Sequence, residues 1–319
     1  MSLAEAQQAL AAWGGAEVPP RLIKDRENAV YEVVLAGGRR AALRLHRAGY
    51  QTAAAIRSEL DWTRALAAAG LSVPEPVPTL SGVLVHEPEQ GRAASVVGWV
   101  EGTPLGEAFT PLSGSVPAQI ARFRAIGRLL AEMHNATDAV QLPAGFTRPR
   151  WDIEGLLGDR PFWGRFWQNP ALTGDERALL QQARAAARQV LEDFRARGGD
   201  YGLIHGDLMR ENLLLDGDRI SLIDFDDSGF GFRLYDLGTL MIQNLDEPAF
   251  PELQAAALAG YRAARPLDAQ DAALLPMFTM LRCLASCGWA VPRMAPDDPR
   301  LRDYAARAAG QARAFLAAS

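Results

Sequence analysis

The sequence predicts an α+β fold, with a small N-terminal region of antiparallel sheet followed by a larger, mainly helical C-terminal region. Short apolar runs joined by glycine turns fill the first hundred residues, and long amphipathic stretches come after them. A single hairpin motif, rich in Asp and Asn, interrupts the helical part. We expect two domains, an N-terminal lobe over residues 1–101 and a helical C-terminal lobe over residues 102–319.

The composition is that of a globular protein. The chain has 319 residues, of which 49% are hydrophobic, enough for a substantial core. Its net charge of −5 argues against nonspecific nucleic-acid binding, which needs a clustered cationic surface. No run of apolar residues is long enough for a membrane span, and the first residues lack a basic segment ahead of an apolar one. We therefore expect a cytoplasmic protein that binds neither nucleic acid nor membrane; oligomeric state is left open.

The N-terminal elements follow from turn and propensity signals. The turn residues Gly37 and Gly38 separate two strands, and a polar bend at residues 24–28 lies within the first of them. This bend holds Lys24, which is the only lysine of the chain. The expected elements are a helix over 4–13, strands over 21–35 and 40–45, a helix over 53–69, and strands over 83–86 and 93–100.

The C-terminal region reads as helices. Residues 117–134 and 175–197 are long and amphipathic, and the second stretch ends at Gly198-Gly199. His134 fits a hydrogen-bonded core histidine better than a ligand. The segment 146–167 is rich in Trp and Phe, and it either lines a substrate pocket or packs the lobe. Cys283 and Cys287 lie four apart and are expected on one helix face as small buried hydrophobes.

The hairpin motif lies between Leu203 and Asp236. Its two apolar runs flank an Asp216-Gly217 turn signal, which is typical of a short β-hairpin. Pairing Leu215 with Ile220 puts Asn212 opposite Ile223, one residue from Asp224. An amide and a carboxylate are therefore expected to meet at the open end of the hairpin, as a site for a hard cation.

Three polar residues of this stretch have the spacing that phosphoryl transfer needs. Asp207 is followed five residues later by Asn212, and Asp224 comes directly after the second strand of the hairpin. One carboxylate can accept the proton of an attacking hydroxyl, while an amide and a second carboxylate hold Mg²⁺ against the phosphates. The sequence predicts Asp207 as the catalytic base and Asn212 and Asp224 as metal ligands, with ATP and Mg²⁺ as cofactors.

A resemblance to a known family rests on two runs, His205-Gly206-Asp207 with Asn212, and Ile223-Asp224-Phe225-Asp226-Asp227. They resemble the aminoglycoside phosphotransferase and choline kinase-like family, and locally its homoserine kinase and stress-response kinase branches. In that family His-Gly-Asp replaces the His-Arg-Asp of protein kinases. The resemblance implies a bilobal, protein-kinase-like fold. It also implies that Asp236 supports the catalytic loop, while His205 holds this loop by backbone hydrogen bonds.

The same resemblance assigns nucleotide contacts to the N-terminal lobe. Ala42 and Arg44 occupy the place where kinases carry Ala-x-Lys, with the small residue over adenine and the cation on the phosphates. Arginine here departs from the family pattern, and the alternative for Arg44 is a surface charge on an edge strand. Glu59 is placed as its partner. Trp99 and Val100 fall in the expected adenine hinge, where Trp99 is either an adenine wall or a core aromatic.

The acceptor is predicted from the acidic end of the motif. Asp226 and Asp227 suit a cationic substrate, extend the metal site, or form a solvated turn. The leading hypothesis is transfer of the γ-phosphate of ATP to a hydroxyl of a small, amine-bearing molecule such as homoserine, an amino alcohol or an aminoglycoside. A stress-response Ser/Thr protein kinase is the alternative, although the thirteen residues from Asp224 to Asp236 are short for a peptide platform. A weakly catalytic nucleotide-binding regulator is the third reading.

Overall fold

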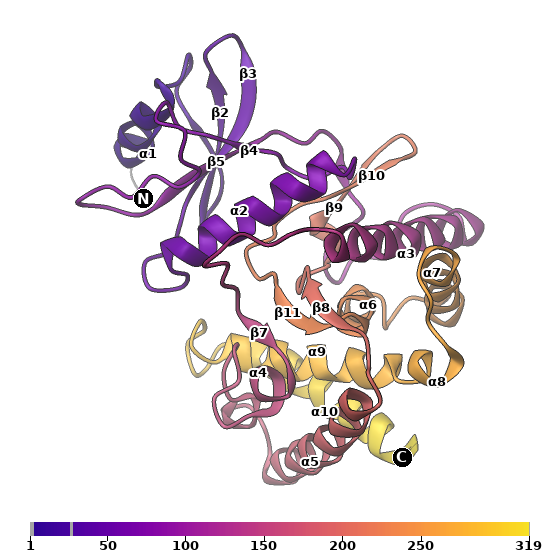
Figure 1. The fold of residues 1–319 in the computed structure, drawn as a ribbon. Coiled ribbons are helices and arrows are strands. Elements are labelled where there is room, and N and C mark those ends of the chain that lie inside the picture. The colour runs from indigo at the N-terminus through magenta and orange to yellow at the C-terminus, as the bar shows by residue number, and fades with distance from the viewer. Residues whose placement is uncertain (1–2, 26–27, 319) are drawn as a thin grey trace. The chain divides into compact units, whose positions relative to one another are not determined.

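The computed structural model describes residues 3–25 and 28–318 and divides into two compact units (Figure 1). The first unit comprises Met1–Thr103, Ala139–Arg148 and Leu213–Asp226, and the second comprises Pro104–Asp138, Pro149–Asn212 and Asp227–Ser319. An antiparallel sheet dominates the first unit and helices dominate the second, which confirms the predicted α+β class. The lobe boundary after residue 101 stays a prediction.

The first unit contains a five-stranded antiparallel sheet. Its spatial order is β1 (Arg21–Asp25), β2 (Ala29–Leu35), β3 (Arg39–Leu45), β5 (Ala94–Gly98) and β4 (Pro76–Val77). The strand predicted over 21–35 is two antiparallel strands, because the polar bend reverses the chain; its residues 26 and 27 lie outside the described part. The turn between β2 and β3 uses Gly37 and Gly38 at φ of 76° and 73°, which L side chains rarely adopt.

One predicted strand of this sheet is wrong. Residues 83–86 form only a single bridge, between His86 and Ala94. The backbone N–H of Thr79 donates to the carbonyl of Val83, and the backbone N–H of Val83 donates to the hydroxyl of Thr79. This local turn takes up backbone groups that a strand would offer to its neighbour, so the segment stays irregular.

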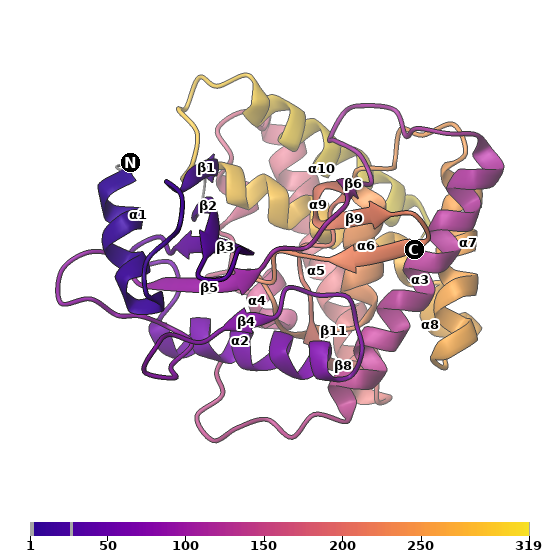
Figure 2. The same cartoon turned by 90° about the horizontal axis from the view of Figure 1, so that it is seen from above.

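Helix α2 (Ala53–Ala68) lies beside β4 and β5 (Figure 2). Thr52 caps its N-terminus by accepting from the backbone N–H of Ala55. Its buried face meets a satellite core formed by Ile56, Leu60, Leu84, Val85 and Val97. At the N-terminus, α1 (Leu3–Leu10) and the 3-10 turn η1 (Ala11–Trp13) confirm the helix predicted over residues 4–13.

The predicted hairpin belongs to the first unit. Strands β9 (Leu213–Asp216) and β10 (Arg219–Leu222) pair with Leu215 opposite Ile220, which confirms the predicted register. The turn residue Gly217 has a φ of 59°. Short strand β6 (Thr103–Pro104) pairs with β9, and the hydroxyls of Ser72 and Ser221 lie 2.7 Å apart. These contacts fix the strand that leads into Asp224.

The second unit is helical around a small three-stranded sheet. The sheet has the order β7 (Arg150–Trp151), β11 (Gly229–Phe232) and β8 (Tyr201–Ile204). The helices are α3 (Val116–Asp138), α4 (Ile153–Leu157), η2 (Phe166–Gln168), α5 (Gly174–Ala196), η3 (Arg210–Asn212), α6 (Leu234–Ile242), α7 (Phe250–Ala264), α8 (Ala269–Ala272), α9 (Leu275–Ala290) and α10 (Arg300–Ala318). The long helices predicted over 117–134 and 175–197 are confirmed as α3 and α5.

Helices α3 and α7 approach closely. A Cβ atom on Gly127 of α3 would lie 2.0 Å from the carbonyl oxygen of Ala257, so only glycine permits this contact. The approach brings His134 of α3 to Tyr261 of α7, whose hydroxyl lies 2.8 Å from His134 Nδ1. His134 is buried, which confirms it as a hydrogen-bonded core histidine.

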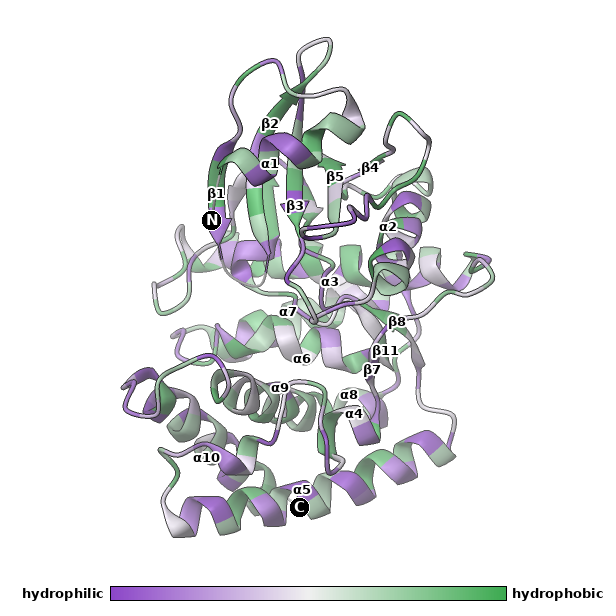
Figure 3. Ribbon diagram, turned by 90° about the vertical axis from the view of Figure 1, so that its left-hand side faces the viewer, coloured by the Kyte–Doolittle hydropathy of each residue, from purple (hydrophilic) through white to green (hydrophobic). Residues whose placement is uncertain are grey.

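Helix α9 is the central helix of the second unit. Figure 3 shows it as mostly apolar, and nearly all of its residues are buried. The stretch Ala269–Ala290 is long and apolar enough to cross a membrane, but 67% of its most apolar window is buried within the protein, as in a core helix. Cys283 and Cys287 are free and buried on α9, as predicted, and burial raises the pKa of each thiol to about 12. The cytoplasmic location stays a prediction.

Candidate active site

The loop after β8 is held by a buried carboxylate. Asp236, in the first turn of α6, accepts hydrogen bonds from the backbone N–H groups of His205 at 2.8 Å and Gly206 at 2.7 Å. His134 Nε2 lies 3.1 Å from the same carboxylate. Burial raises the pKa of Asp236, but these hydrogen bonds outweigh it and the pKa is lowered, so the group is ionised. Asp236 does not cap α6 with its side chain; it fixes the loop that carries Asp207.

His205 contributes to the same loop. Its Nδ1 accepts from the backbone N–H of Asp207 at 3.3 Å, and its ring is fully buried. Gly206 has a φ of 78°, and a Cβ there would lie 2.7 Å from the carbonyl oxygen of Asp227. Glycine is therefore required between His205 and Asp207.

Asp207 and Asn212 meet within the second unit. The Asn212 amide nitrogen donates to the backbone carbonyl of Asp207 at 2.8 Å and to Asp207 Oδ2 at 3.1 Å. Both amide hydrogens are therefore used, and the amide oxygen of Asn212 remains as an acceptor. An amide oxygen beside a carboxylate is a donor set that suits a hard divalent cation, so the residues present fit Mg²⁺.

A buried arginine is paired with Asp207. Arg282 of α9 donates from Nη2 to Asp207 Oδ1 at 2.7 Å, and from Nη1 to the hydroxyl of Ser286. Its guanidinium lies 4.3 Å from the ring centroid of Trp163. Burial lowers the pKa of Arg282, but the interactions with Tyr235 and with the carboxylate of Asp207 outweigh burial and raise the pKa above its ordinary value, so Arg282 is a cation. Nothing in the sequence singled out this residue, because it stands 75 positions from its partner in a chain rich in arginine.

The tryptophan-rich segment surrounds Asp227. Trp163 donates from its indole N–H to Asp227 Oδ1 at 3.3 Å, and Trp151 donates to the backbone carbonyl of Asp227 at 2.8 Å. The two indoles are in edge contact, with centroids 5.0 Å apart, and Trp289 lies 6.4 Å from Trp163. Trp151 is fully buried and Trp163 nearly so. The segment therefore packs the unit and also places aromatic rings beside Asp227 and Arg282.

In the first unit, Asp224 follows strand β10, with Ile223 between them. Its backbone φ is 66°, a left-handed conformation that is uncommon for residues other than glycine. Lys24 Nζ lies 4.0 Å from Asp224 Oδ2, at the limit of an ion pair between two partly exposed side chains. Of the polar bend predicted over residues 24–28, Arg26 and Glu27 lie outside the described residues.

Arg44 and Glu59 form a buried ion pair in the same unit. Arg44 Nη1 lies 2.7 Å from Glu59 Oε1, and the two residues are 8% and 1% exposed. Since β3 lies between β2 and β5, Arg44 is on an inner strand and is not the edge-strand surface charge that was the alternative. Arg44 Nε and Nη2 and Glu59 Oε2 have no hydrogen-bond partner among the described residues. Buried donors without partners are costly unless something binds them.

The predicted adenine hinge contains no deeply buried side chain. Trp99 is half-buried, with the guanidinium of Arg40 4.6 Å from its ring centroid, and it is therefore not a core aromatic. Val100 and Ala42 are also half-buried. The nucleotide contacts assigned to Ala42, Trp99 and Val100 stay predictions.

Asp226 and Asp227 have opposite environments. Asp226 is 4% exposed, and its Oδ1 has no hydrogen-bond partner among the described residues. Burial and the negative charges of Glu59 and Asp224 raise its pKa to about 7, against the charges of Arg44 and Arg148. Burial among these groups disfavours the substrate contact predicted for Asp226, whereas Asp227 lies in the other unit beside Trp163.

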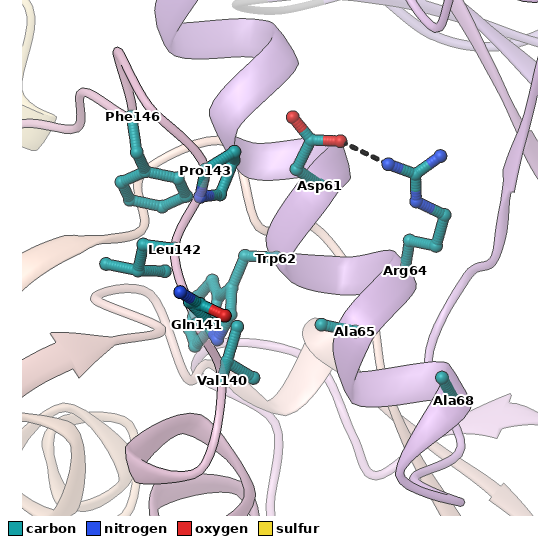
Figure 4. Close-up of a pocket in the computed structure, with 10 residues that line it drawn as sticks. All are labelled: Asp61, Trp62, Arg64, Ala65, Ala68, Val140, Gln141, Leu142, Pro143 and Phe146. Carbon is teal, nitrogen blue, oxygen red and sulfur yellow. Dashed lines mark hydrogen bonds and ion pairs between the residues drawn. The ribbon is translucent and has the colours of Figure 1, made fainter.

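A pocket of about 380 Å³ lies beside α2 (Figure 4). Its walls come from α2 and from the segment 139–148, and an ion pair between Asp61 and Arg64 lies at its edge. Trp62 forms part of the lining, and its ring is also in edge contact with Phe225, at 5.4 Å between centroids. The pocket is therefore next to a residue that packs against the turn after β10.

Comparison with relatives agrees with this geometry. The amicoumacin kinase of Bacillus subtilis (strain 168) is 27% identical over 286 residues, covering 86% of this chain and 80% of the relative. The homoserine kinase of Sinorhizobium fredii (strain NBRC 101917 / NGR234) is 32% identical over 221 residues, and the match spans 60% of that enzyme's length.

Solved structures extend the likeness to the whole chain. A microcompartment-associated aminopropanol kinase is 35% identical, with a TM-score of 0.85 over 99% of this chain and 98% of that one. An amicoumacin kinase in complex with AMP-PNP and Ca²⁺ shares the fold, with a TM-score of 0.75 at 23% identity over 96% of this chain and 92% of that one. The protein-kinase-like fold class is thereby confirmed.

The family model for the phosphotransferase enzyme family matches residues 20–273, which include Asp207, Asn212 and Asp224 but not Arg282. The match spans both the sheet and the loop that carries Asp207. Enzymes of this kind use ATP and transfer its phosphate to hydroxyl groups of small molecules. On these grounds the chain belongs to the phosphotransferase enzyme family and is an ATP-dependent kinase of small molecules.

Proposed function

We propose that the protein transfers the γ-phosphate of ATP, with Mg²⁺, to the hydroxyl of a small amino alcohol. The observation that carries this proposal is the Asp207 carboxylate, which Asn212 and Arg282 hold from opposite oxygens. A fixed carboxylate of this kind can accept the proton of an attacking hydroxyl, and phosphoryl transfer depends mainly on such positioning.

Each unit contributes its own residues to the reaction. In the second unit, Asp207 orients the acceptor hydroxyl and takes its proton, while the amide oxygen of Asn212 would hold the metal. In the first unit, Asp224 would be the second metal ligand, and Arg44, kept in place by Glu59, would contact the phosphates. Bound Mg²⁺ would neutralise the negative charge of the phosphates during transfer.

The amine of the acceptor is assigned to Asp227. Its carboxylate accepts a hydrogen bond from Trp163, so an acid and an aromatic ring lie together in the second unit. An ammonium group is stabilised by a carboxylate through a charged hydrogen bond. The relatives act, by name, on aminopropanol, amicoumacin and homoserine, and an amine is part of each of these molecules.

An amino alcohol without a carboxylate suits the site better than an amino acid. A carboxylate on the acceptor would call for a cation, and the cation next to Asp207 is Arg282, which is already paired with it. Placing a second carboxylate there would set two negative charges against one guanidinium. We therefore expect 1-amino-2-propanol to be a better acceptor than L-threonine, which differs from it by a carboxylate.

The test is an assay of ADP release with Mg-ATP and a panel of acceptors, with the product identified by ³¹P NMR as a phosphate ester. The panel contains 1-amino-2-propanol, ethanolamine, choline, L-homoserine, L-threonine and 1,2-propanediol. We expect kcat/KM for 1-amino-2-propanol to exceed that for 1,2-propanediol, its neutral analogue, roughly 10- to 100-fold, the effect of one charged hydrogen bond. No phosphate ester from any acceptor, or equal rates for the amine and the diol, would overturn the proposal.

A further inference from the structure

We propose that Arg148 is a positioning residue for Asp224, holding the turn Asp224-Phe225-Asp226 against the N-terminal end of α2. The inference rests on the proposed function in one respect, the assignment of Asp224 to the metal. Arg148 itself touches neither the nucleotide nor the acceptor in this proposal. It acts through the backbone of the two residues that follow Asp224.

The contacts of Arg148 carry the inference. Its Nη1 donates to the carbonyl of Ala55 at 2.9 Å, and its Nη2 donates to the carbonyls of Phe225 at 3.2 Å and Asp226 at 2.5 Å. The residue is 6% exposed. One guanidinium therefore joins the first turn of α2 to two consecutive peptide groups, a geometry that its planar, fork-shaped set of donors makes possible.

The turn that Arg148 holds contains the strained residue of this region. Asp224 has a φ of 66°, a left-handed backbone conformation that residues other than glycine rarely adopt. Such a conformation persists only when the surroundings determine it. Here the surroundings are the Arg148 hydrogen bonds on the carbonyls and the packing of the buried Phe225 ring on Trp62.

The charge of Arg148 adds to the effect of its hydrogen bonds. The acids near the turn are the buried Glu59 and Asp226 and the partly exposed Asp224, and they face Arg44 and Arg148. Loss of the Arg148 charge would leave Arg44 as the remaining buried guanidinium against these carboxylates. The turn would then open more readily, because like charges in a buried site repel each other.

A second hydrogen bond attaches the segment 139–148 to α2 without contacting the turn Asp224-Phe225-Asp226. The backbone N–H of Thr147 donates to the hydroxyl of Ser58 on α2 at 2.9 Å. Ser58→Ala thus loosens the segment 139–148 from α2 but leaves the carbonyls of Phe225 and Asp226 bound. It is the matched control for Arg148→Lys, which keeps the charge and the buried stem but loses the fork of donors.

Two measurements test the proposal. The first is hydrogen exchange of the backbone amides of residues 224–227 in the protein without nucleotide or metal. The second is the Mg²⁺ concentration that gives half-maximal activity with ATP. For Arg148→Lys we expect exchange to be roughly tenfold faster and the Mg²⁺ requirement to rise about three- to tenfold, as for the loss of one hydrogen bond. For Ser58→Ala we expect both to stay at the wild-type values, and Arg148→Gln serves as the second variant if the lysine variant does not fold.

The outcomes separate the hypotheses. Faster exchange at residues 224–227 in the Arg148 variants alone supports the positioning role of Arg148 even if the enzyme proves inactive, because hydrogen exchange needs no turnover. A lower melting temperature with wild-type exchange at 224–227 would show that Arg148 serves stability alone and would overturn the proposal. Equal effects of Ser58→Ala and Arg148→Lys would also overturn it, since the segment as a whole would then be responsible.

Discussion

The carboxylate of Asp207 and the guanidinium of Arg282 form an ion pair, with Oδ1 and Nη2 2.7 Å apart. The arginine is buried, while the Asp207 side chain remains 22% exposed. With Oδ1 on Arg282 and Oδ2 on Asn212, the plane of the carboxylate is determined by two partners from different elements. A base held in this way loses little orientational freedom when the acceptor binds.

We expect Arg282→Met to lower kcat roughly 10- to 100-fold with little change in the KM for ATP, because the carboxylate loses its orientation. Arg282→Lys should recover part of the loss, since an ammonium keeps the charge but not the stacking on Trp163. Steady-state kinetics with both substrates measure these effects. Ser286→Ala is the control: it removes the other partner of Arg282 and should keep kcat within about twofold of wild type, whereas an equal loss there would show that only packing matters.

Asp207→Asn tests the base directly. The substitution keeps the shape but removes the proton acceptor, so kcat should fall roughly 10²- to 10⁴-fold, the range for general-base groups. The Kd for ATP, measured by calorimetry, should stay near the wild-type value because Asp207 is not assigned to the nucleotide. Asp216→Asn, at the exposed hairpin turn, is the matched control and should be fully active. Normal turnover by Asp207→Asn would remove Asp207 from the reaction.

Asp227→Asn separates the two neighbouring acids. Loss of one charged contact to the amine should raise the KM of the amino alcohol about 10- to 100-fold, with a smaller change in kcat. Activity on the neutral diol should change little, so the preference for the amine should disappear. Asp226→Asn is the comparison, and it should keep the preference because Asp226 is buried with Arg44 and Glu59. The assignment is contradicted if Asp226→Asn, and not Asp227→Asn, abolishes the preference.

The pH dependence of stability should reflect buried histidines. Burial lowers the pKa of His134 from 6.5 to about 4, and burial lowers the pKa of His46 as well. The unfolded chain therefore binds more protons than the folded protein between these values. The contribution of His134 to the free energy of unfolding should fall by on the order of 2 to 3 kcal/mol as the pH drops from 6.5 towards 4. Asp226, whose pKa burial raises from 3.8 to about 7, contributes in the opposite direction over the same window, so the His134 effect is measured as a difference between wild type and a variant without this ring.

Urea denaturation at several pH values from 7 to 4 measures this slope. His134→Gln removes the titrating ring, and its slope in this window should be smaller than that of wild type. Equal slopes for wild type and His134→Gln would contradict the neutral state of His134. Asp236 acts in a lower window, because its pKa is lowered from 3.8 and its contribution is lost only when it protonates.

Local patterns in the sequence predicted much of this structure. The register of the β9–β10 hairpin followed from a turn signal and two apolar runs, and the contact of Asp207 with Asn212 lies within one loop. The strand predicted over 83–86 failed because a side chain, that of Thr79, competed for the backbone. Periodicity cannot detect such competition.

Contacts between residues that lie far apart along the chain could not be predicted from the sequence. Arg282 lies 75 residues from Asp207 and Arg148 lies 77 residues from Phe225, and arginine is too common in this chain for either to stand out. Asp226 and Asp227 are neighbours of the same residue type, but their environments differ. Asp226 is buried among charged side chains of the first unit, whereas Asp227 is the first residue of a segment of the second unit. Tertiary packing decides between them, and no local signal does.

Lys24, whose ammonium lies 4.0 Å from Asp224, is the only lysine of the chain. Reagents that acylate primary amines therefore have one side-chain target, and it stands next to a residue that we assign to the metal. A fluorophore attached there would report binding of Mg-ATP by a change in emission, without a cysteine having to be engineered. Protection of Lys24 from acylation by Mg-ATP would map the nucleotide by mass spectrometry of a single peptide.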